Sequence, residues 1–454
     1  MGAGKEGKRR RIVVVGGGFG GAFAVQRLAS RLRSDEAEVL LIDRNNFFVF
    51  HPFLVEAGTG SLHPQHAVVG LRAFTGARGL LMGEFTGADF SRRVVKVQPV
   101  GSVDEREIPF DELVLALGSV TSLPPIPGLK EHALQVKNVA DAIALRDRAI
   151  RLLEQADQCG DRDLRRSLLH FVVVGSSFTG VEVAGEFEVF LRRASRRFAN
   201  VTGGDISVTL VDLADRILPN LDPELAAFAA DKLSARGMDL RLGTSVRELA
   251  AGHVDLDDGA RLATQTVIWC AGIAPNPALA GLSLPTDPRG WVLCEPDLRV
   301  RGQQHVWAIG DCAVNPGPDG SPYPATAQAA VQQGRAVAGN LVRVMRGQRT
   351  VPCTARNRGT LVALGCRTGV ARIGPFKLAG FLAWFLWRTV YLMKMPGWGR
   401  RLRVALEWTI ALFFGQDDVQ LGVLVNRPPA PGIASASDRR TRSPRPESDP
   451  GSSG

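Results

Sequence analysis

The chain has 454 residues, a length typical of about three domains. Its residues are 45% apolar and 22% charged, a composition that excludes a wholly disordered protein. Six cysteines are too few for a disulfide scaffold, and no apolar run reaches the roughly 18 residues of a spanning helix, which excludes a polytopic transporter. The net charge is +10. The stretch from Gly320 to Leu406 contains fourteen Lys and Arg and no Asp or Glu, so this region is expected to face an anionic partner.

The first predicted element is a strand that leads into a glycine-rich turn. The β-branched residues 12–15 precede Gly16-x-Gly18-x-x-Gly21, a run with helical spacing follows, and a second strand ends at Asp43. This order is the dinucleotide-binding fingerprint in its required context. The glycines allow a tight turn and close approach of the backbone to a pyrophosphate, and Asp43 is placed to accept from ribose hydroxyls.

The same pattern returns about 160 residues later. A strand over residues 170–174 precedes Gly175-x-Ser177-x-x-Gly180, and a helix and a second strand ending at Asp212 follow. Two such units predict two dinucleotide sites, one for FAD and one for NADH. Ser177 replaces the middle glycine and is expected to crowd the pyrophosphate, so the alternative is a second domain that binds nothing. Gly272 is a further candidate for contact with NADH.

Two later glycine turns complete the pattern of a flavin site. Residues 112–118 form a predicted buried strand ending at Gly118, and residues 306–313 form another that reaches Gly310-Asp311. With these segments the chain resembles the two-dinucleotide-fold flavoprotein reductases. The resemblance implies that Gly118 and Gly310 belong to the FAD site, that Asp311 binds the ribityl chain, and that the FAD domain is discontinuous.

Residues 323–334 and 50–60 narrow the resemblance to the type II NADH dehydrogenases, the single-subunit NADH:quinone oxidoreductases. That family carries an A-Q-x-A-x-Q-x-G helix beside the flavin and the quinone, and this chain matches it from Ala327 to Gly334. The resemblance implies that Gln328 and Gln332 shape a quinone pocket.

The Thr-Gly-Val-Glu segment that ends at Glu182 also resembles that family, whose glutamate lies at the nicotinamide face of the flavin. It implies that Glu182 and Gln328 are catalytic, with Glu182 positioning the nicotinamide or relaying a proton. The alternative for Glu182 is a first-turn glutamate that stabilises a helix N-terminus.

The C-terminal stretch is predicted to lie on a membrane through about residues 376–414. Residues 376–395 are apolar on nearly every side, and the eleven-residue spacing of Lys377 and Arg388 predicts one face of a helix. A Pro-Gly break, three arginines and a second apolar helix over residues 404–414 follow. Four tryptophans are expected at the headgroup region: Trp384, Trp387, Trp398 and Trp408. The alternatives are a cap on the core or a homodimer interface, and a nucleic-acid partner is not expected.

The sequence therefore predicts an α/β protein with two doubly wound dinucleotide-binding domains and a C-terminal membrane-binding region. The expected bounds are 11–125 and 291–350 for the FAD domain, 126–290 for the NAD domain, 351–426 for the membrane-binding region and 427–454 for a disordered tail. The predicted function is NADH:quinone oxidoreduction without proton pumping, by a peripheral protein on the cytoplasmic face of a bacterial membrane.

Three other functions stay open. The fold is shared by sulfide:quinone oxidoreductases, for which Cys159 and Cys353 are the candidate thiols, but no C-x-x-C or C-x₄-C pair is present. The basic region also suits a reductase of a small acidic electron-transfer protein. A flavin-binding scaffold or signalling protein is the alternative outside the enzymes. No metal site is expected, because the histidines lack ligand spacing.

Overall fold

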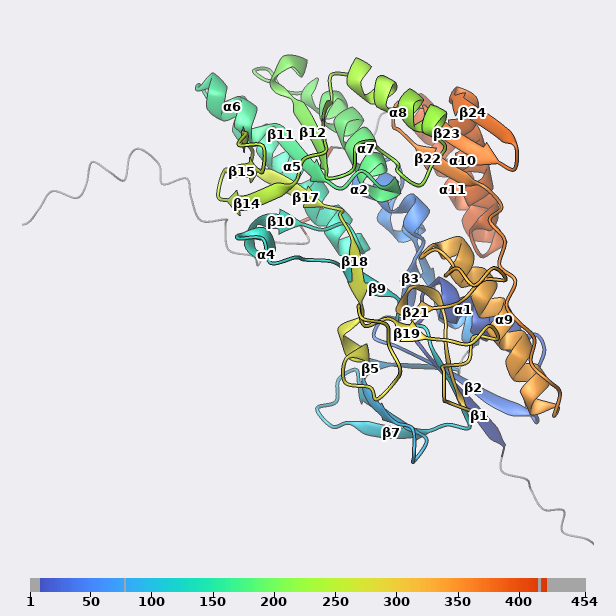
Figure 1. The fold of residues 1–454 in the computed structure, drawn as a ribbon. Helices are drawn as coiled ribbons and strands as arrows, with labels where there is room; N and C mark the ends of the chain where they lie inside the picture. Colours follow the sequence, from blue (N-terminus) through green and yellow to red (C-terminus); the bar gives the residue numbers. More distant parts are fainter. Residues whose placement is uncertain (1–8, 77–78, 415–417, 423–454) are drawn as a thin grey trace, which may run out of the picture.

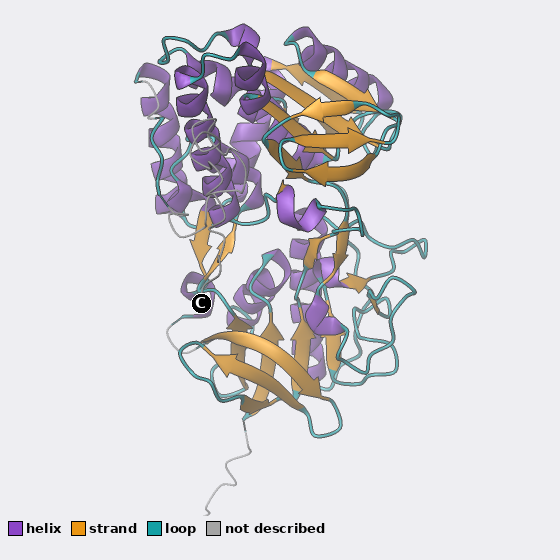
Figure 2. Cartoon of the chain, turned by 90° about the vertical axis from the view of Figure 1, so that its left-hand side faces the viewer, coloured by secondary structure: helices purple, strands orange, loops and turns teal. Residues whose placement is uncertain are grey.

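The computed structural model describes residues 9–76, 79–414 and 418–422, so the predicted tail over residues 427–454 lies outside them. Figures 1 and 2 show two lobes, each built around a parallel sheet with helices packed against it. The last strands and helices pack beside the lobe that contains the second sheet. This arrangement confirms the predicted α/β fold with two doubly wound units.

The first lobe contains a seven-stranded sheet in the order β20-β8-β1-β2-β5-β6-β7. Strands β20, β8, β1, β2 and β5 pair in parallel, and β6 and β7 add an antiparallel edge. Because β20 follows β8 by almost two hundred residues, the lobe is discontinuous in sequence, as predicted. The bounds are β1 (Arg10–Val15), β2 (Ala37–Asp43), β5 (Leu80–Asp89), β6 (Val94–Pro99), β7 (Arg106–Pro109), β8 (Glu112–Leu115) and β20 (Val306–Ala308).

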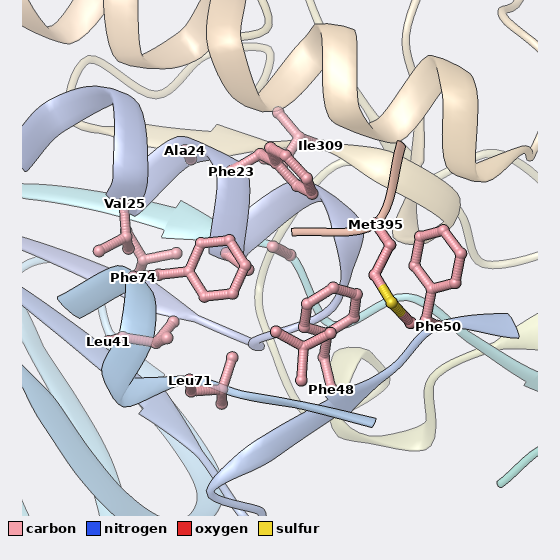
Figure 3. Close-up of a cluster of buried hydrophobic side chains, with 14 of the residues drawn as sticks. Phe23, Ala24, Val25, Leu41, Phe48, Phe50, Leu71, Phe74, Ile309 and Met395 are labelled. Atoms are coloured by element: carbon pink, nitrogen blue, oxygen red, sulfur yellow. The ribbon is translucent and has the colours of Figure 1, made fainter. Parts of the chain in front are cut away.

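Two helices lie together against this sheet, α1 (Phe19–Ala29) and α9 (Ala327–Met345). Their close approach requires glycine at position 334, because a Cβ atom there would lie only 2.3 Å from the carbonyl oxygen of Gly20. Aromatic side chains fill the adjoining core, and Figure 3 shows Phe48 and Phe50 beside Met395, which comes from the C-terminal region. The C-terminal segment therefore contributes side chains to the first lobe's core as well as packing beside the second lobe.

The second lobe contains a five-stranded parallel sheet in the order β10-β17-β11-β12-β13 and a small antiparallel sheet, β14-β15-β16. Helix α5 (Val139–Gln158) starts at an Asn138 capping box, and α7 (Phe178–Ser195) follows the second glycine turn. The other bounds are β10 (Ala133–Leu134), α6 (Arg162–Leu168), β11 (His170–Val174), β12 (Ser207–Asp212), α8 (Pro223–Ala235), β13 (Asp239–Leu242), β14 (Val246–Ala250), β15 (His253–Leu256), β16 (Arg261–Ala263) and β17 (Thr266–Trp269).

Shorter elements connect these parts. Strand β9 (Ser119–Thr121) pairs with β18 (Ile273–Pro275) along the two chain segments that join the lobes. The remaining bounds are β3 (Phe47–Val49), η1 (His51–Phe53), α2 (Leu54–Gly58), η2 (Pro64–Ala67), β4 (Val68–Gly70), α3 (Arg72–Thr75), α4 (Leu129–His132), η3 (Gly203–Asp205), η4 (Pro277–Leu279), β19 (Val292–Leu293), η5 (Gly310–Cys312) and β21 (Ala313–Val314).

The C-terminal region is a three-stranded antiparallel sheet followed by two helices. Its elements are β22 (Thr360–Ala363), β23 (Gly369–Ile373), β24 (Phe376–Gly380), α10 (Phe381–Lys394) and α11 (Trp398–Phe413). No helix within the described ranges is long and apolar enough to cross a membrane.

The prediction that Lys377 and Arg388 share one helix face is wrong. Lys377 belongs to β24, which pairs with β23, and Gly380 at φ +75° separates that strand from α10. Lys377 forms ion pairs with Asp222 and Glu224, whereas Arg388 lies next to Glu56 inside the molecule. An apolar run without clear periodicity did not distinguish a strand followed by a helix from one long helix.

Candidate functional site

The first glycine turn has the geometry of a phosphate cradle. Gly16 has φ +100°, and a Cβ atom there would lie 2.2 Å from the carbonyl oxygen of Ala116. A Cβ atom at Gly21 would lie 1.8 Å from the Gly16 oxygen, so both positions require glycine. Gly18 differs, because no chain atom lies within 4 Å of the position its Cβ would take. This open space at the N-terminus of α1 fits a pyrophosphate.

The carboxylate of Asp43 is held against this turn. It accepts hydrogen bonds from the backbone N–H of Gly17 at 2.6 Å and of Asn45 at 2.7 Å, one on each oxygen. A carboxylate has about four acceptor positions, so it can still accept from ribose hydroxyls. The residues of this turn therefore fit the FAD assignment, which stays a prediction.

The second turn repeats this geometry in detail. Gly175 has φ +102°, and a Cβ atom at Gly180 would lie 1.7 Å from its oxygen. Asp212 accepts from the Ser176 hydroxyl at 2.7 Å, from the Ser176 N–H and from the Ala214 N–H at 2.8 Å. Ser177 is exposed and does not cap α7 with its side chain. Ser177 stands where the first turn has Gly18 and open space, so its side chain is expected to crowd the pyrophosphate of a nicotinamide cofactor.

Gly118 and Gly272 both have positive φ, +65° and +72°. No chain atom lies within 4 Å of the position that a Cβ atom at Gly118 would take. A Cβ atom at Gly272 would approach the Ser122 side chain to 3.1 Å. Both glycines follow strands at the carboxyl edges of their sheets, where parallel α/β sheets bind ligands.

Asp311 lies in a cavity of about 400 Å³ that residues from β18, η5 and the N-terminal part of α9 line. Burial raises the pKa of its carboxyl group, and nearby Lys137 opposes that rise. The Asp311 carboxylate is 3.4 Å from the Ser119 hydroxyl, which is 3.5 Å from the Lys137 ammonium. Lys137 is a site residue that sequence reasoning missed, because a lone lysine before a helix carries no motif.

Gln333 of α9 is a further site residue that sequence reasoning missed: it is buried and accepts from the Gly310 N–H at 2.7 Å. It thereby holds the Gly310-Asp311 turn. Gln328 and Gln332 instead contact the segment over residues 356–358 through its backbone and the Asn357 side chain. The structure thus brings these two glutamines together at the first turns of α9, facing the C-terminal region.

Glu182 lies on α7, and its carboxylate accepts from the Ala363 N–H of β22 at 3.3 Å. Burial raises the pKa of Glu182 to about 8, so this side chain is largely protonated at neutral pH. The first turn of α7 contains no acidic residue, so the alternative of a first-turn glutamate is wrong. A protonated carboxyl group in this place is suited to donate a proton.

Three of the four tryptophans expected at a membrane point into the protein. Trp384, Trp387 and Trp408 are buried, and the last two pack edge-on against Phe53 with ring centroids 6.1 and 5.3 Å apart. Trp398 alone among the four is exposed, with 73% of its surface accessible. The expectation for the other three was wrong because Trp387 and Trp408 pack against Phe53 of the N-terminal part of the chain, and Trp384 packs within the C-terminal region against Phe381 and Arg388.

Three of the described cysteines, including the candidate thiol Cys353, are poorly suited to sulfur chemistry. Burial raises the pKa of Cys353, Cys312 and Cys270, to about 11 for the first two and about 12 for the third. These thiols are therefore protonated at neutral pH, whereas thiol exchange requires a thiolate.

Comparisons with known proteins identify the family of this chain and several similar proteins. Residues 10–334 match the family described as pyridine nucleotide-disulphide oxidoreductase, and residues 357–417 match the NDH2 C-terminal domain. The type II NADH:quinone oxidoreductase Ndh of Mycobacterium tuberculosis is 29% identical over 420 residues, covering 89% of this chain and 88% of that protein. The internal alternative NAD(P)H-ubiquinone oxidoreductase A1 of Arabidopsis thaliana is 30% identical over 445 residues, covering 91% and 86%. An NDH2 structure from Plasmodium falciparum in complex with NADH shares the fold, with a TM-score of 0.84 and 18% identity over 91% of this chain and 100% of that one.

Proposed function

Because the chain belongs to the pyridine nucleotide-disulphide oxidoreductase family and within it to the type II NADH:quinone oxidoreductases, we propose that it is an FAD-dependent enzyme that transfers two electrons from NADH to a membrane quinone. When bound, FAD supplies the hydride-accepting and electron-transferring chemistry. The observation that supports this function most directly is the pair of matching glycine turns, one at each parallel sheet.

The proposed sites follow the bounds expected from the sequence. Residues 11–125 and 291–350 hold FAD through the first turn, Gly118 and Gly310-Asp311, and residues 126–290 hold NADH through the second turn and Gly272. Gln328 and Gln332 shape the quinone pocket, and Glu182 positions the nicotinamide or relays a proton. Residues 351–426 contribute the membrane-facing surface.

The experiment that tests the function is steady-state oxidation of NADH by the FAD-loaded protein with and without a short water-soluble quinone. We expect quinone to accelerate turnover strongly. A scaffold or signalling protein would show no such acceleration, and a reductase of a small electron-transfer protein would prefer a ferredoxin as acceptor.

The membrane-facing surface consists of apolar side chains on α10 and α11. The exposed apolar residues of α11 recur every three or four positions, so they form one continuous stripe along the helix. The exposed members of this surface are Phe381, Leu382, Phe385, Met393, Trp398, Leu402, Leu406, Ile410 and Phe413. Arg403 is exposed at the start of α11, where a cation suits anionic lipid. We propose that this surface docks on the cytoplasmic face of the cell membrane, and a homodimer through it is the alternative.

The enzyme is expected to prefer NADH to NADPH by at least about tenfold in kcat/KM, which corresponds to roughly 1.4 kcal/mol. Asp212 would accept from the ribose 2′-hydroxyl and repel a 2′-phosphate. Arg216, which could otherwise pair with that phosphate, donates to the Pro219 carbonyl at 2.7 Å. Steady-state rates with both donors measure the preference, and equal efficiency would refute the role of Asp212.

Replacing Gln328 with Ala is expected to slow flavin reoxidation by quinone about tenfold while leaving flavin reduction by NADH nearly unchanged. The side chain contacts the Asn357 side chain and the Arg358 N–H, so its loss loosens this segment on the quinone side. Stopped-flow absorbance separates the two half-reactions. Gln348→Ala, at an exposed position just beyond the other end of α9, is the matched control. Unchanged reoxidation in Gln328→Ala would remove its quinone role.

A further inference from the structure

The carboxylate of Asp212 is held by three hydrogen bonds, two of which come from a single residue, Ser176. The backbone N–H and the hydroxyl group of Ser176 both donate to the same oxygen, Oδ2, the hydroxyl at 2.7 Å. The backbone N–H of Ala214 donates to the other oxygen, Oδ1, at 2.8 Å. Ser176 has none of its surface exposed, so its hydroxyl group is shielded from water that would compete for the bond.

The first turn has no side chain at the corresponding position, which is Gly17. Its N–H donates to Asp43, and the N–H of Asn45 donates to the other oxygen of that carboxylate. A Cβ atom at Gly17 would lie 2.5 Å from the Leu71 side chain, so Leu71 fills the space where a side chain would begin. The second turn therefore has a hydroxyl donor where the first turn has none.

These bonds determine how many further partners each aspartate has room for. A carboxylate has about four acceptor positions, shared between its two oxygens. Asp43 keeps about two of these positions, whereas Asp212 keeps about one, on Oδ1. The Asp212 carboxylate is thus suited to accept from a single ribose hydroxyl.

The same bonds limit the movement of the Asp212 carboxylate. A rotation that turns Oδ2 away breaks both bonds from Ser176 and leaves a buried hydroxyl group without a partner, which is unfavourable. A hydrogen bond to an ionised carboxylate is also stronger than one between neutral groups. The carboxylate therefore stays where Ser176 places it.

Ser176 also holds the loop that follows β12. Its carbonyl oxygen accepts from the Leu218 N–H at 2.8 Å, and Leu218 and Ile217 are each 1% exposed. The start of this loop is bound as well, because the Gly243 N–H donates to the Ala214 carbonyl at 2.9 Å. One buried serine therefore fixes both the carboxylate and the loop beside it.

We propose that Ser176 is the positioning residue that makes the second site select a dinucleotide with a free ribose 2′-hydroxyl. A hydroxyl group can donate to the acceptor position that remains on Asp212. A 2′-phosphate carries about 1.5 to 2 negative charges near neutral pH, and it meets a carboxylate that cannot turn away. The inference rests on the proposed function, in which this site binds NADH, and it names the residue through which Asp212 discriminates against NADPH.

The test measures the binding of ADP-ribose and of 2′-phospho-ADP-ribose to the FAD-loaded protein by titration calorimetry. Neither probe contains nicotinamide, so binding is measured without hydride transfer, and bound FAD keeps both probes out of the first site. Ser176→Ala removes only the hydroxyl oxygen. The ratio of the two dissociation constants should then shift toward the phosphorylated probe by on the order of fivefold, because the carboxylate can turn away. The affinity for ADP-ribose should stay within about threefold, because Asp212 can still accept from its 2′-hydroxyl.

Ser176→Gly gives the second turn the residue of the first, and it should shift the ratio in the same direction. It keeps the test decisive if the alanine variant does not fold, which thermal unfolding of each variant shows. Thr202→Val is the matched control. The hydroxyl and the N–H of Thr202 both donate to one oxygen of Asp205, at 2.6 and 2.9 Å, but this pair precedes β12 whereas Asp212 ends it. The control should keep the ratio of the unaltered protein.

The outcomes separate this inference from the function on which it rests. If both serine variants keep the ratio of the unaltered protein, or weaken both probes equally, Ser176 does not determine specificity and the proposed function stands. If the unaltered protein binds neither probe, the second turn holds no dinucleotide and the inference is wrong together with the proposed NADH site. The function itself is decided separately, by whether quinone accelerates the oxidation of NADH by the unaltered enzyme.

Discussion

Replacing Gly18 with Ala is expected to yield a folded protein that has lost about 10- to 100-fold of its affinity for FAD, or roughly 1.4 to 2.8 kcal/mol. Gly18 has φ −69° and ψ −163°, a conformation open to any residue, and no chain atom would touch the added methyl group. The loss must therefore come from contact with the cofactor, whose pyrophosphate approaches the backbone at this position. Titration of the apoprotein with FAD, followed by flavin fluorescence, measures it.

The chain itself shows that this turn accepts a side chain. Ser177 occupies the same position of the second turn with nearly the same backbone angles, φ −68° and ψ −177°. Gly160→Ala, at an exposed glycine with open space around its Cβ position, is the matched control and should leave FAD affinity unchanged. Equal affinity in Gly18→Ala and the unaltered protein would show that the pyrophosphate lies elsewhere.

Replacing Leu382, Phe385, Leu406 and Ile410 together with Ser or Gln is expected to release the protein almost completely from anionic vesicles. Each side chain is more than half exposed on α10 or α11. If each loses about 1 kcal/mol of burial in the bilayer, the sum of about 4 kcal/mol corresponds to roughly 10³-fold weaker binding. High salt alone should release the protein only partly, since it screens charge but leaves apolar burial intact. Sedimentation with vesicles measures both effects.

The same variant should separate docking from chemistry. A short water-soluble quinone should still be reduced, whereas a long-chain quinone held in the bilayer should be reduced far more slowly. Val100→Ser with Val103→Ser removes exposed apolar side chains from a distant loop and should change neither property. If the unaltered protein fails to bind anionic vesicles at low salt, the membrane role is wrong and a dimer interface becomes the better explanation for this surface.

Local patterns in the sequence were sufficient for the two glycine turns. The strand, the turn, the helix and the acid at the end of the next strand all lie within residues 12–43 in the first unit and 170–212 in the second, and each feature has a short-range physical cause. The turns at Gly118 and Gly310 followed from the same reasoning about strand ends. Fold class and cofactor type were therefore predictable.

The features that failed depend on contacts between distant parts of the chain. The burial of Trp387 and Trp408 follows from Phe53 and Glu56, more than 330 residues earlier. The contact between α2 and α7 is likewise visible only once the chain has folded. A single sequence shows the apolar or acidic character of each segment, but it does not show which side of a helix another segment will cover.

The strand order of the first lobe also sets the order in which the newly made chain can mature. The strands of the second lobe's parallel sheet all lie between residues 133 and 269, so this lobe can form as soon as they leave the ribosome. The first lobe begins earlier but waits for β20, Asp311 and α9, which ends at Met345. With FAD held as proposed, its capture is expected late in biosynthesis, and the apolar stripe on α11 emerges later still. The surface that would reach the membrane thus becomes available only after the parts that hold both cofactors have been made.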